Sequence, residues 1–168
     1  GPAIDHRDIV VASSPDGMAG WSAAPVRVND DTGSTDQAFP ALAVDGDGGL
    51  HVTWYDRRFD PRWRAGADFM LASSFDGGAT FTPNARVSTG SSWWQVVADM
   101  EPNFGDFTRP CAAGNRLYLP WTDSRQGSPD VLVAPLQTAG TVGAPDSVWA
   151  HVGDSLHVEV VVTNDTPY

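Results

Sequence analysis

The sequence contains no lysine, so all ten of its basic residues are arginines. Glutamate is almost as rare, with two among 21 acidic residues, and the formal net charge is −11. A nucleic-acid backbone requires clustered cations on its partner, so this charge argues against nucleic acid as a ligand. The simplest role of the excess negative charge is solubility.

Cysteine and long apolar runs are also scarce. The single cysteine, Cys111, cannot form a disulfide within the chain, and its apolar, strand-like surroundings predict a buried, unreactive thiol. The longest apolar run, around Val160–Val162, is far too short to span a bilayer, so no membrane span is expected. No long window keeps apolar residues at helical spacing, and no signal peptide is visible.

Glycine and proline are plentiful, at 17 and 13 residues, which favours short strands joined by tight turns. The chain also repeats itself. Asp8–Trp21 (DIVVASSPDGMAGW) matches Asp68–Phe81 (DFMLASSFDGGATF), and Asp130–Leu136 (DVLVAPL) begins the same unit a third time. Internal repetition of this length is typical of repeat architectures, so we expect an all-β fold built from repeated units.

A second repeated element lies between these copies. Phe39–Arg58 matches Phe107–Arg125, so that Trp54 corresponds to Trp121 and Asp56 to Asp123. Together the elements predict strands near 8–14, 20–28, 40–45, 50–56, 68–74, 79–87, 110–113, 116–122 and 130–136. A repeat with four short strands has the size of one propeller blade with long loops.

The turn in the best-preserved repeat resembles the Asp-box, Ser-x-Asp-x-Gly-x-Thr-Trp/Phe, of sialidase-like BNR-repeat proteins. Its residues here are Ser74, Asp76, Gly78, Thr80 and Phe81, and a degenerate copy contains Ser14, Asp16 and Trp21, with Gly20 where threonine is expected. The aspartate should accept backbone N–H bonds, glycine should take positive φ, and the aromatic ring should tuck under the turn. We therefore expect a structural motif, and Asp76→Ala should lower stability without changing ligand affinity.

The resemblance covers roughly residues 8–136 and is to the C-terminal part of bacterial secreted BNR-repeat proteins. It implies a secreted or cell-surface location and a partial β-propeller of about two and a half four-stranded blades in residues 3–136. Residues 137–147 have the composition of a linker. Residues 148–168 form a further β segment, which is either the start of an immunoglobulin-like module or a strand that completes the last blade.

Such a partial propeller has open edges at both ends. We expect the rest of a propeller, self-association, or residues 148–163 folding back to cover them. The strand directions place the long loops on one face, here called the top face: 29–38, 55–67, 88–106 and 122–129. Function on a repeat scaffold usually lies on the face with the long loops.

The top-face loops are rich in arginine and aromatic residues. Arginine binds carboxylates bidentately and aromatic rings stack on sugars, which indicates an acidic saccharide ligand. The candidate ligand-binding residues are Tyr55, Asp56, Arg57, Arg58, Trp63, Trp93, Trp94, Glu101, Arg109, Asp123 and Arg125. The alternative is an Asp–Arg network that braces the loops, and the recurrence of Trp-x-Asp-x-Arg at Trp121–Arg125 favours it.

Three functions fit this pattern: a carbohydrate-binding propeller segment of a secreted multidomain protein, the C-terminal part of an exo-acting, sialidase-like glycosidase, and a protein-binding scaffold. A sialidase needs an arginine triad, a tyrosine activated by glutamate, and a separate aspartate acid/base. Residues of these types are present, but the Arg-Ile-Pro segment is not. We assign no catalytic residue and expect the chain alone to be inactive on sialosides.

No metal or cofactor is expected. The stretch Asp45-Gly-Asp47-Gly resembles half of a calcium loop, but no glutamate follows at the required position, so a hairpin turn is the favoured interpretation and calcium the alternative. The four histidines show no ligand spacing with one another, so no zinc site is predicted.

Overall fold

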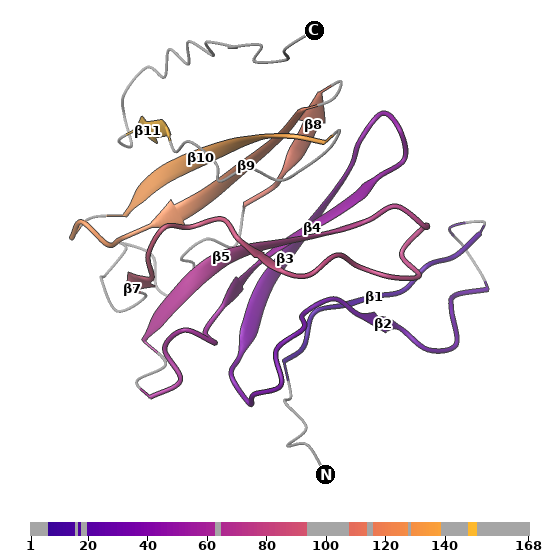
Figure 1. Cartoon of the computed structure of the whole chain (residues 1–168), viewed down its shortest axis with the longest axis horizontal. Coiled ribbons are helices and arrows are strands. Elements are labelled where there is room, and N and C mark those ends of the chain that lie inside the picture. Colours follow the sequence, from indigo (N-terminus) through magenta and orange to yellow (C-terminus); the bar gives the residue numbers. More distant parts are fainter. Residues whose placement is uncertain are drawn as a thin grey trace, which may run out of the picture.

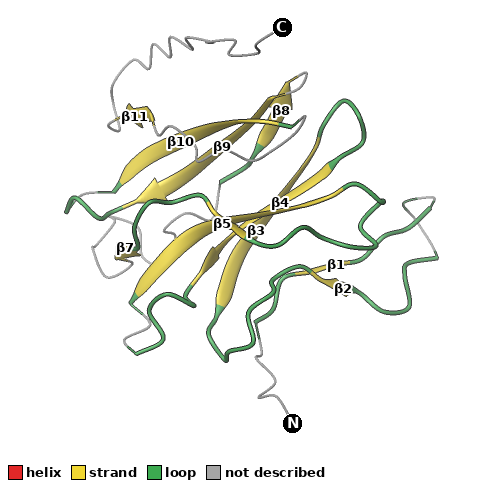
Figure 2. Ribbon diagram, in the orientation of Figure 1, coloured by secondary structure: helices red, strands yellow, loops and turns green. Residues whose placement is uncertain are grey.

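The computed structural model of the chain is built from antiparallel β-sheets (Figures 1 and 2). The structure describes residues 7–15, 17, 20–62, 65–93, 108–113, 116–127, 129–138 and 148–150. Those ranges contain strands, turns and loops but no helix, so none of them holds an apolar helix of membrane-spanning length. The prediction of an all-β chain is confirmed.

In chain order, the strands are β1 (Val10–Val11), β2 (Val26–Arg27), β3 (Gln37–Val44), β4 (Leu50–Asp56), β5 (Gly66–Ser74), β6 (Ala85–Arg86), β7 (Ser92–Trp93), β8 (Cys111–Ala113), β9 (Arg116–Asp123), β10 (Asp130–Gln137) and β11 (Val148–Ala150). β1 and β2 form a two-stranded sheet. The two larger sheets have the orders β3-β4-β5-β6 and β8-β9-β10-β11, and β7 pairs with the first residues of β5.

The predicted strand at 50–56 is β4, and those at 68–74, 116–122 and 130–136 lie within β5, β9 and β10. The predictions at 8–14, 20–28 and 79–87 are too long, because only two residues of each pair as a regular strand. In the turn after β5, isolated hydrogen bonds take the place of a regular strand ladder. One of them is the bond from Thr82 N to Ser73 O at 2.8 Å.

One pairing register recurs in all three repeats. Each repeated unit begins with an aspartate, and the residue two positions later pairs with the neighbouring antiparallel strand. The three equivalent pairs are Val10 with Arg27, Met70 with Arg86, and Leu132 with Trp149. β11 thus occupies, in the last repeat, the place that β2 and β6 occupy in the first two. This is the pairing that a strand completing the last four-stranded sheet would make. Residues 151–168 lie outside the described residues.

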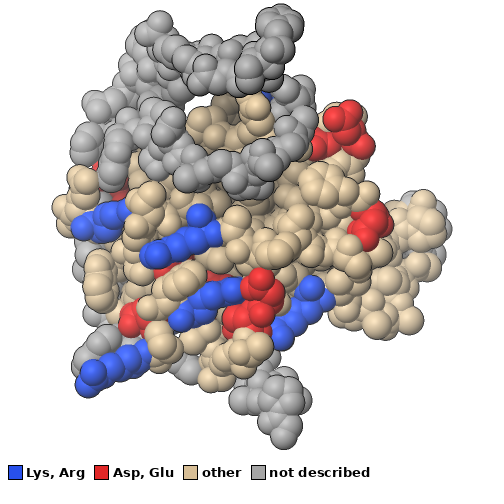
Figure 3. All heavy atoms as spheres, in the orientation of Figure 1, with Lys and Arg blue, Asp and Glu red and all other residues tan. Residues whose placement is uncertain are grey.

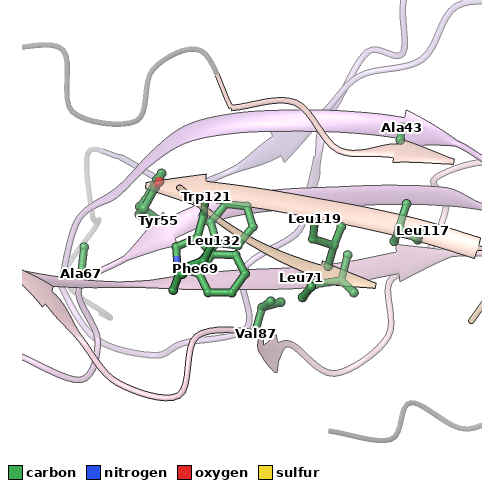
Figure 4. Close-up of a cluster of buried hydrophobic side chains, with 11 residues drawn as sticks. Ala43, Tyr55, Ala67, Phe69, Leu71, Val87, Leu117, Leu119, Trp121 and Leu132 are labelled. Atoms are coloured by element: carbon green, nitrogen blue, oxygen red, sulfur yellow. The ribbon is translucent and has the colours of Figure 1, made fainter. Parts of the chain in front are cut away.

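The two larger sheets pack face to face around one apolar core (Figure 4). β5 contributes Phe69 and Leu71, and β9 contributes Leu119 and Trp121. The rings of Phe69 and Trp121 are stacked with their centroids 5.6 Å apart. This core lies between the second and third repeats, so neither repeat buries its apolar face alone.

The opposite face of β4 and β5 packs on the β1–β2 hairpin in a second core. Ile9 and Val28 of the first repeat cover Trp54 and its apolar neighbours in β4 and β5. β3 belongs to the same sheet, but on this face Leu42 and Val44 remain 50% and 56% exposed. The hairpin therefore covers only part of the apolar face that the sheet offers.

The expectation that Cys111 is buried is wrong. Cys111 is exposed because it lies on β8, a three-residue strand at the edge of its sheet. Its neighbour Ala112 faces the core, and successive side chains of a strand point to opposite faces.

Candidate functional site

The top end of β4 carries a clamp made by Trp54, Asp56 and Arg58. Asp56 is fully buried, and its Oδ2 accepts a bond from Trp54 Nε1 at 3.0 Å and one from Arg58 Nε at 2.9 Å. Its Oδ1 accepts the backbone N–H of Arg58 at 2.8 Å. Both carboxylate oxygens of Asp56 therefore accept hydrogen bonds from within the chain, and these bonds stabilise the start of the loop that follows β4.

β9 carries the same clamp at its top end. Asp123 Oδ2 accepts from Trp121 Nε1 at 3.1 Å and from Arg125 Nε at 2.9 Å, and Oδ1 accepts the Arg125 N–H at 2.9 Å. Burial opposes ionisation of Asp123, but the hydrogen bonds from Arg125 outweigh it and hold the pKa below its usual value. The same hydrogen bonds therefore occur in two repeats. They form the Asp–Arg network bracing the loops that the sequence analysis gave as the alternative to ligand binding.

Tyr55 joins the two large sheets. Its side chain is buried, and its hydroxyl oxygen accepts the N–H of Thr122 in β9 at 2.7 Å. Burial raises the pKa of Tyr55 to about 12. This environment opposes ionisation of the phenol, whereas a catalytic tyrosine nucleophile needs it promoted.

The other predicted site residues are dispersed. Arg57 lies 3.9 Å from the carboxylate of Asp36, and Arg109 is exposed ahead of β8. Trp63, Trp94 and Glu101 lie outside the described residues. From the predicted set, the structure thus brings Trp93, Asp123 and Arg125 onto neighbouring segments.

An exposed tryptophan lies beside the second clamp. Trp93 in β7 is 47% exposed, and its backbone oxygen accepts a bond from Ser124 Oγ at 2.5 Å. Ser124 also donates its N–H to Ser92 Oγ at 2.8 Å, so the residue next to Arg125 fixes β7. Arg125 also contacts the segment just before β7, where it donates a hydrogen bond to Thr89 Oγ1 at 2.7 Å. The indole and the guanidinium are therefore held on neighbouring segments.

A second aromatic–arginine pair lies at the same end of β5. The guanidinium carbon of Arg86 is 4.5 Å from the centroid of the Phe59 ring, and Phe59 is exposed. Arg86 is held in turn by buried Asp68, through Nε at 2.8 Å. β7 pairs with the first residues of β5, so Trp93 is near this end as well.

Sequence reasoning missed Phe59, Arg86, Asp68 and Ser124. The internal repeat could have indicated Asp68 and Arg86, because each repeated unit begins with an aspartate and, in the first two units, an arginine lies on the strand that pairs with it. The pair Asp8–Arg27, with an O···N distance of 2.8 Å, repeats the pair Asp68–Arg86. Figure 3 shows arginine side chains interspersed with acidic ones over the face in view.

The turn that contains Ser74, Asp76 and Gly78 has the hydrogen bonds and glycine φ angles expected of it. Asp76 Oδ1 accepts the N–H of Thr80 at 2.9 Å, and Ser74 Oγ accepts the N–H of Gly78 at 2.8 Å. Gly77 and Gly78 adopt positive φ angles of 73° and 88°. The Thr80 hydroxyl, which also donates to Asp76, is the main reason that the pKa of Asp76 falls to about 2.

The aromatic residues of the two Asp-box copies behave differently. Phe81 packs against the core beneath the turn, as expected. Trp21 is 59% exposed, so the expectation that it tucks under its turn is wrong. Ser14 still accepts the N–H of Gly17 at 3.1 Å, but Gly20 has no hydroxyl to repeat the bond of Thr80. Asp16 lies outside the described residues.

Asp45 closes the hairpin between β3 and β4, which confirms the turn interpretation. Its Oδ1 accepts the N–H of Gly49 at 2.7 Å and that of Asp47 at 3.0 Å. Its Oδ2 is 3.0 Å from His51 Nε2, and His51 Nδ1 is 2.8 Å from Ser73 Oγ. Within the described ranges, no three His, Cys, Asp or Glu side chains converge in a way that could hold a metal ion.

Comparison with known proteins adds no family to this description. No protein-family model matches the chain, and no curated protein matches it in sequence. The functional argument therefore depends on the geometry of the top face.

Proposed function

We propose that the chain is a segment of an Asp-box β-propeller whose top-face loops bind carbohydrate, with acidic glycans as the favoured class. Support for the propeller comes from two sheets with the same strand order, stacked face to face, and from the pairing register shared by all three repeats. Repeats that bury their apolar faces only against one another are typical of such folds.

The observation that carries the binding proposal is the exposed Trp93 of β7, a strand that is bonded to Ser124, the residue before Arg125. An exposed indole offers a flat apolar surface on which a sugar ring can stack. The bonds from Arg125 to Asp123 and Thr89 use three of the five guanidinium N–H groups. The others suit a carboxylate of the ligand, and the clamp holds the guanidinium in place before binding, which lowers the entropic cost.

Phe59 and Arg86 extend this surface along the top end of β5. The ring is exposed, and the guanidinium beneath it is anchored by Asp68, so the pair is a rigid platform for a second sugar unit. A secreted or cell-surface protein would meet such glycans, in keeping with the resemblance of the sequence.

We favour binding over hydrolysis because of Tyr55. As part of an exo-acting glycosidase the chain would need an activated tyrosine, and Tyr55 is buried with a raised pKa. A glycosidase would have to draw its nucleophile from residues other than this one.

A glycan array followed by calorimetry on the best ligands tests the proposal. Trp93→Ala should weaken binding about tenfold or more, equivalent to about 1.4 kcal/mol. The matched control is Trp21→Ala, which removes an exposed tryptophan from an Asp-box turn and should leave affinity unchanged. Absence of binding to every glycan, or equal loss in both variants, would refute the proposal. Binding to proteins alone would instead favour the scaffold function.

A further inference from the structure

Two enclosed oxygen atoms in the loop between β2 and β3 have no hydrogen-bond partner: Asp31 Oδ2 and Thr35 Oγ1. The Asp31 side chain and the whole of Thr35 are each 6% exposed, so solvent does not satisfy either atom from outside. A methyl group at Gly33 would lie 3.8 Å from Asp31 Oδ2 and 3.9 Å from Thr35 Oγ1. Both oxygens therefore lie within 4 Å of one point, the position of that methyl group.

Leaving these atoms without a partner is costly. A buried carboxylate oxygen accepts only, so it needs a donor or a cation, and burying it unpaired costs far more than burying an unpaired neutral group. The other oxygen of Asp31 is already engaged, because Oδ1 accepts a bond from Asn29 Nδ2 at 2.7 Å. The chain thus orients the carboxylate and leaves its second oxygen without a hydrogen-bond partner.

The charges around Asp31 favour a cation. Asp31 belongs to a network in which four aspartates contact only two arginines: Asp8, Asp30, Asp31 and Asp56 with Arg27 and Arg58. Both arginines approach Asp31 on Oδ1, at 3.4 and 3.5 Å, and neither pairs with Oδ2. The network therefore carries an excess of two negative charges, and the unpartnered oxygen belongs to one of them.

We propose that the loop of residues 29–37 binds one calcium ion, with Asp31 Oδ2 and Thr35 Oγ1 as side-chain ligands. Calcium takes about six to eight oxygen ligands and accepts carboxylate, hydroxyl, carbonyl and water in irregular arrangements, so these two side chains would form only part of its coordination shell and the site should be weak. With so few charged ligands, the dissociation constant should be on the order of 0.1–1 mM, the range of extracellular calcium modules. The ion would hold the loop that leads from the first repeat into β3.

The site differs from the Asp45–Asp47 turn that the sequence offered as a calcium loop. There, every oxygen of the Asp45 carboxylate has a partner within the chain. The two acidic segments can therefore be separated by substitution.

The test combines equilibrium dialysis with calcium and thermal unfolding of the whole chain in calcium or in EDTA. We expect one calcium per chain and a rise of a few degrees in Tm at saturating calcium. Asp31→Asn keeps the oxygen that bonds Asn29 and replaces the free one by an amide, and Thr35→Val removes only the hydroxyl. Both variants should lose the bound ion and the Tm shift, whereas the control Asp47→Asn should keep both.

Several outcomes would overturn the proposal. The first is that the wild-type chain binds no calcium. The second is a Tm shift that survives in both Asp31→Asn and Thr35→Val. The third is an equal Tm shift with sodium at matched ionic strength. If neither variant folds, a crystal structure grown in calcium decides. Oxygen–ion distances of about 2.3–2.6 Å support the site, and a water molecule alone at hydrogen-bond distance refutes it.

Discussion

The hydroxyl oxygen of Tyr55 lies 2.7 Å from the backbone nitrogen of Thr122, a residue 67 positions further along the chain. Tyr55 is the residue before the last in β4 of one large sheet, and Thr122 lies in β9 of the next. This bond ties the top ends of the two sheets together directly above their shared apolar core. Tyr55, which the sequence analysis named as a candidate ligand-binding residue, is therefore buried between the sheets.

We expect Tyr55→Phe to destabilise the fold by about 1–3 kcal/mol, because the partly buried N–H of Thr122 loses its acceptor. The stabilisation that Tyr55 contributes should be complete below pH 10, the ordinary pKa, and should be lost as pH rises through about 12, its pKa in the fold. Ultraviolet titration of the native chain should therefore show one phenol that ionises near pH 12 and is missing from Tyr55→Phe. Titration of all tyrosines near pH 10 in the folded protein would contradict the buried position.

Asp76 should stabilise its turn only in the ionised form. Its pKa is lowered to about 2 in the fold, so its contribution is present above its ordinary pKa near 4 and disappears as pH falls through 2. The Tm difference between wild type and Asp76→Asn should be largest above pH 4 and should vanish near pH 2. Asp47→Asn, in an exposed turn, is the control, and glycan affinity per folded molecule should be unchanged. Loss of binding without loss of Tm would contradict the structural role.

The two clamps should respond alike in stability and differently in binding. Asp56→Asn and Asp123→Asn each remove the charge that a partly buried arginine pairs with, which should cost about 3–5 kcal/mol. Only Asp123→Asn should also weaken glycan binding per folded molecule, because it releases Arg125, the guanidinium proposed to bind the ligand carboxylate. Denaturant unfolding and calorimetry measure the two effects. A stability loss below about 1 kcal/mol in both variants would show that the clamps are incidental.

The uncovered part of the β3–β6 sheet should make the isolated chain associate. Leu42 and Val44 form an apolar strip on β3, and β1, which lies over the same face, is paired on one side only within the described residues. Light scattering should detect association that Leu42→Ser with Val44→Thr reduces, while Phe75→Ser, at an exposed turn, does not. A wild-type chain that stays monomeric, with or without residues 148–168, would contradict this expectation.

The chain alone should not hydrolyse sialosides. A sialidase-like mechanism needs an ionisable tyrosine, and burial raises the pKa of Tyr55 to about 12. A fluorogenic sialoside incubated with the purified chain should release no fluorophore above the buffer rate. Turnover that Tyr55→Phe abolishes would reverse the assignment of this residue.

Local sequence determined the parts of the fold that depend on neighbours along the chain. Alternating apolar residues between Gly-rich turns located β4, and the Asp-box pattern implied the bonds from Ser74 and Asp76, because donor and acceptor are at most four residues apart. The recurrence of Trp-x-Asp-x-Arg likewise pointed to a brace within five residues, which both clamps display.

Only the tertiary structure decided which side chains face solvent and which are shared between repeats. Trp21 and Trp93 are exposed, whereas Trp54 is buried, although all three are tryptophans beside polar turns or strand ends. The partner of Tyr55 lies in another repeat, and the enclosed oxygens of the 29–37 loop arise from how that loop closes on the first repeat. Exposure and long-range bonding depend on the faces that sheets present to one another, and the sequence pattern within one strand carries no information about the sheet that will cover it.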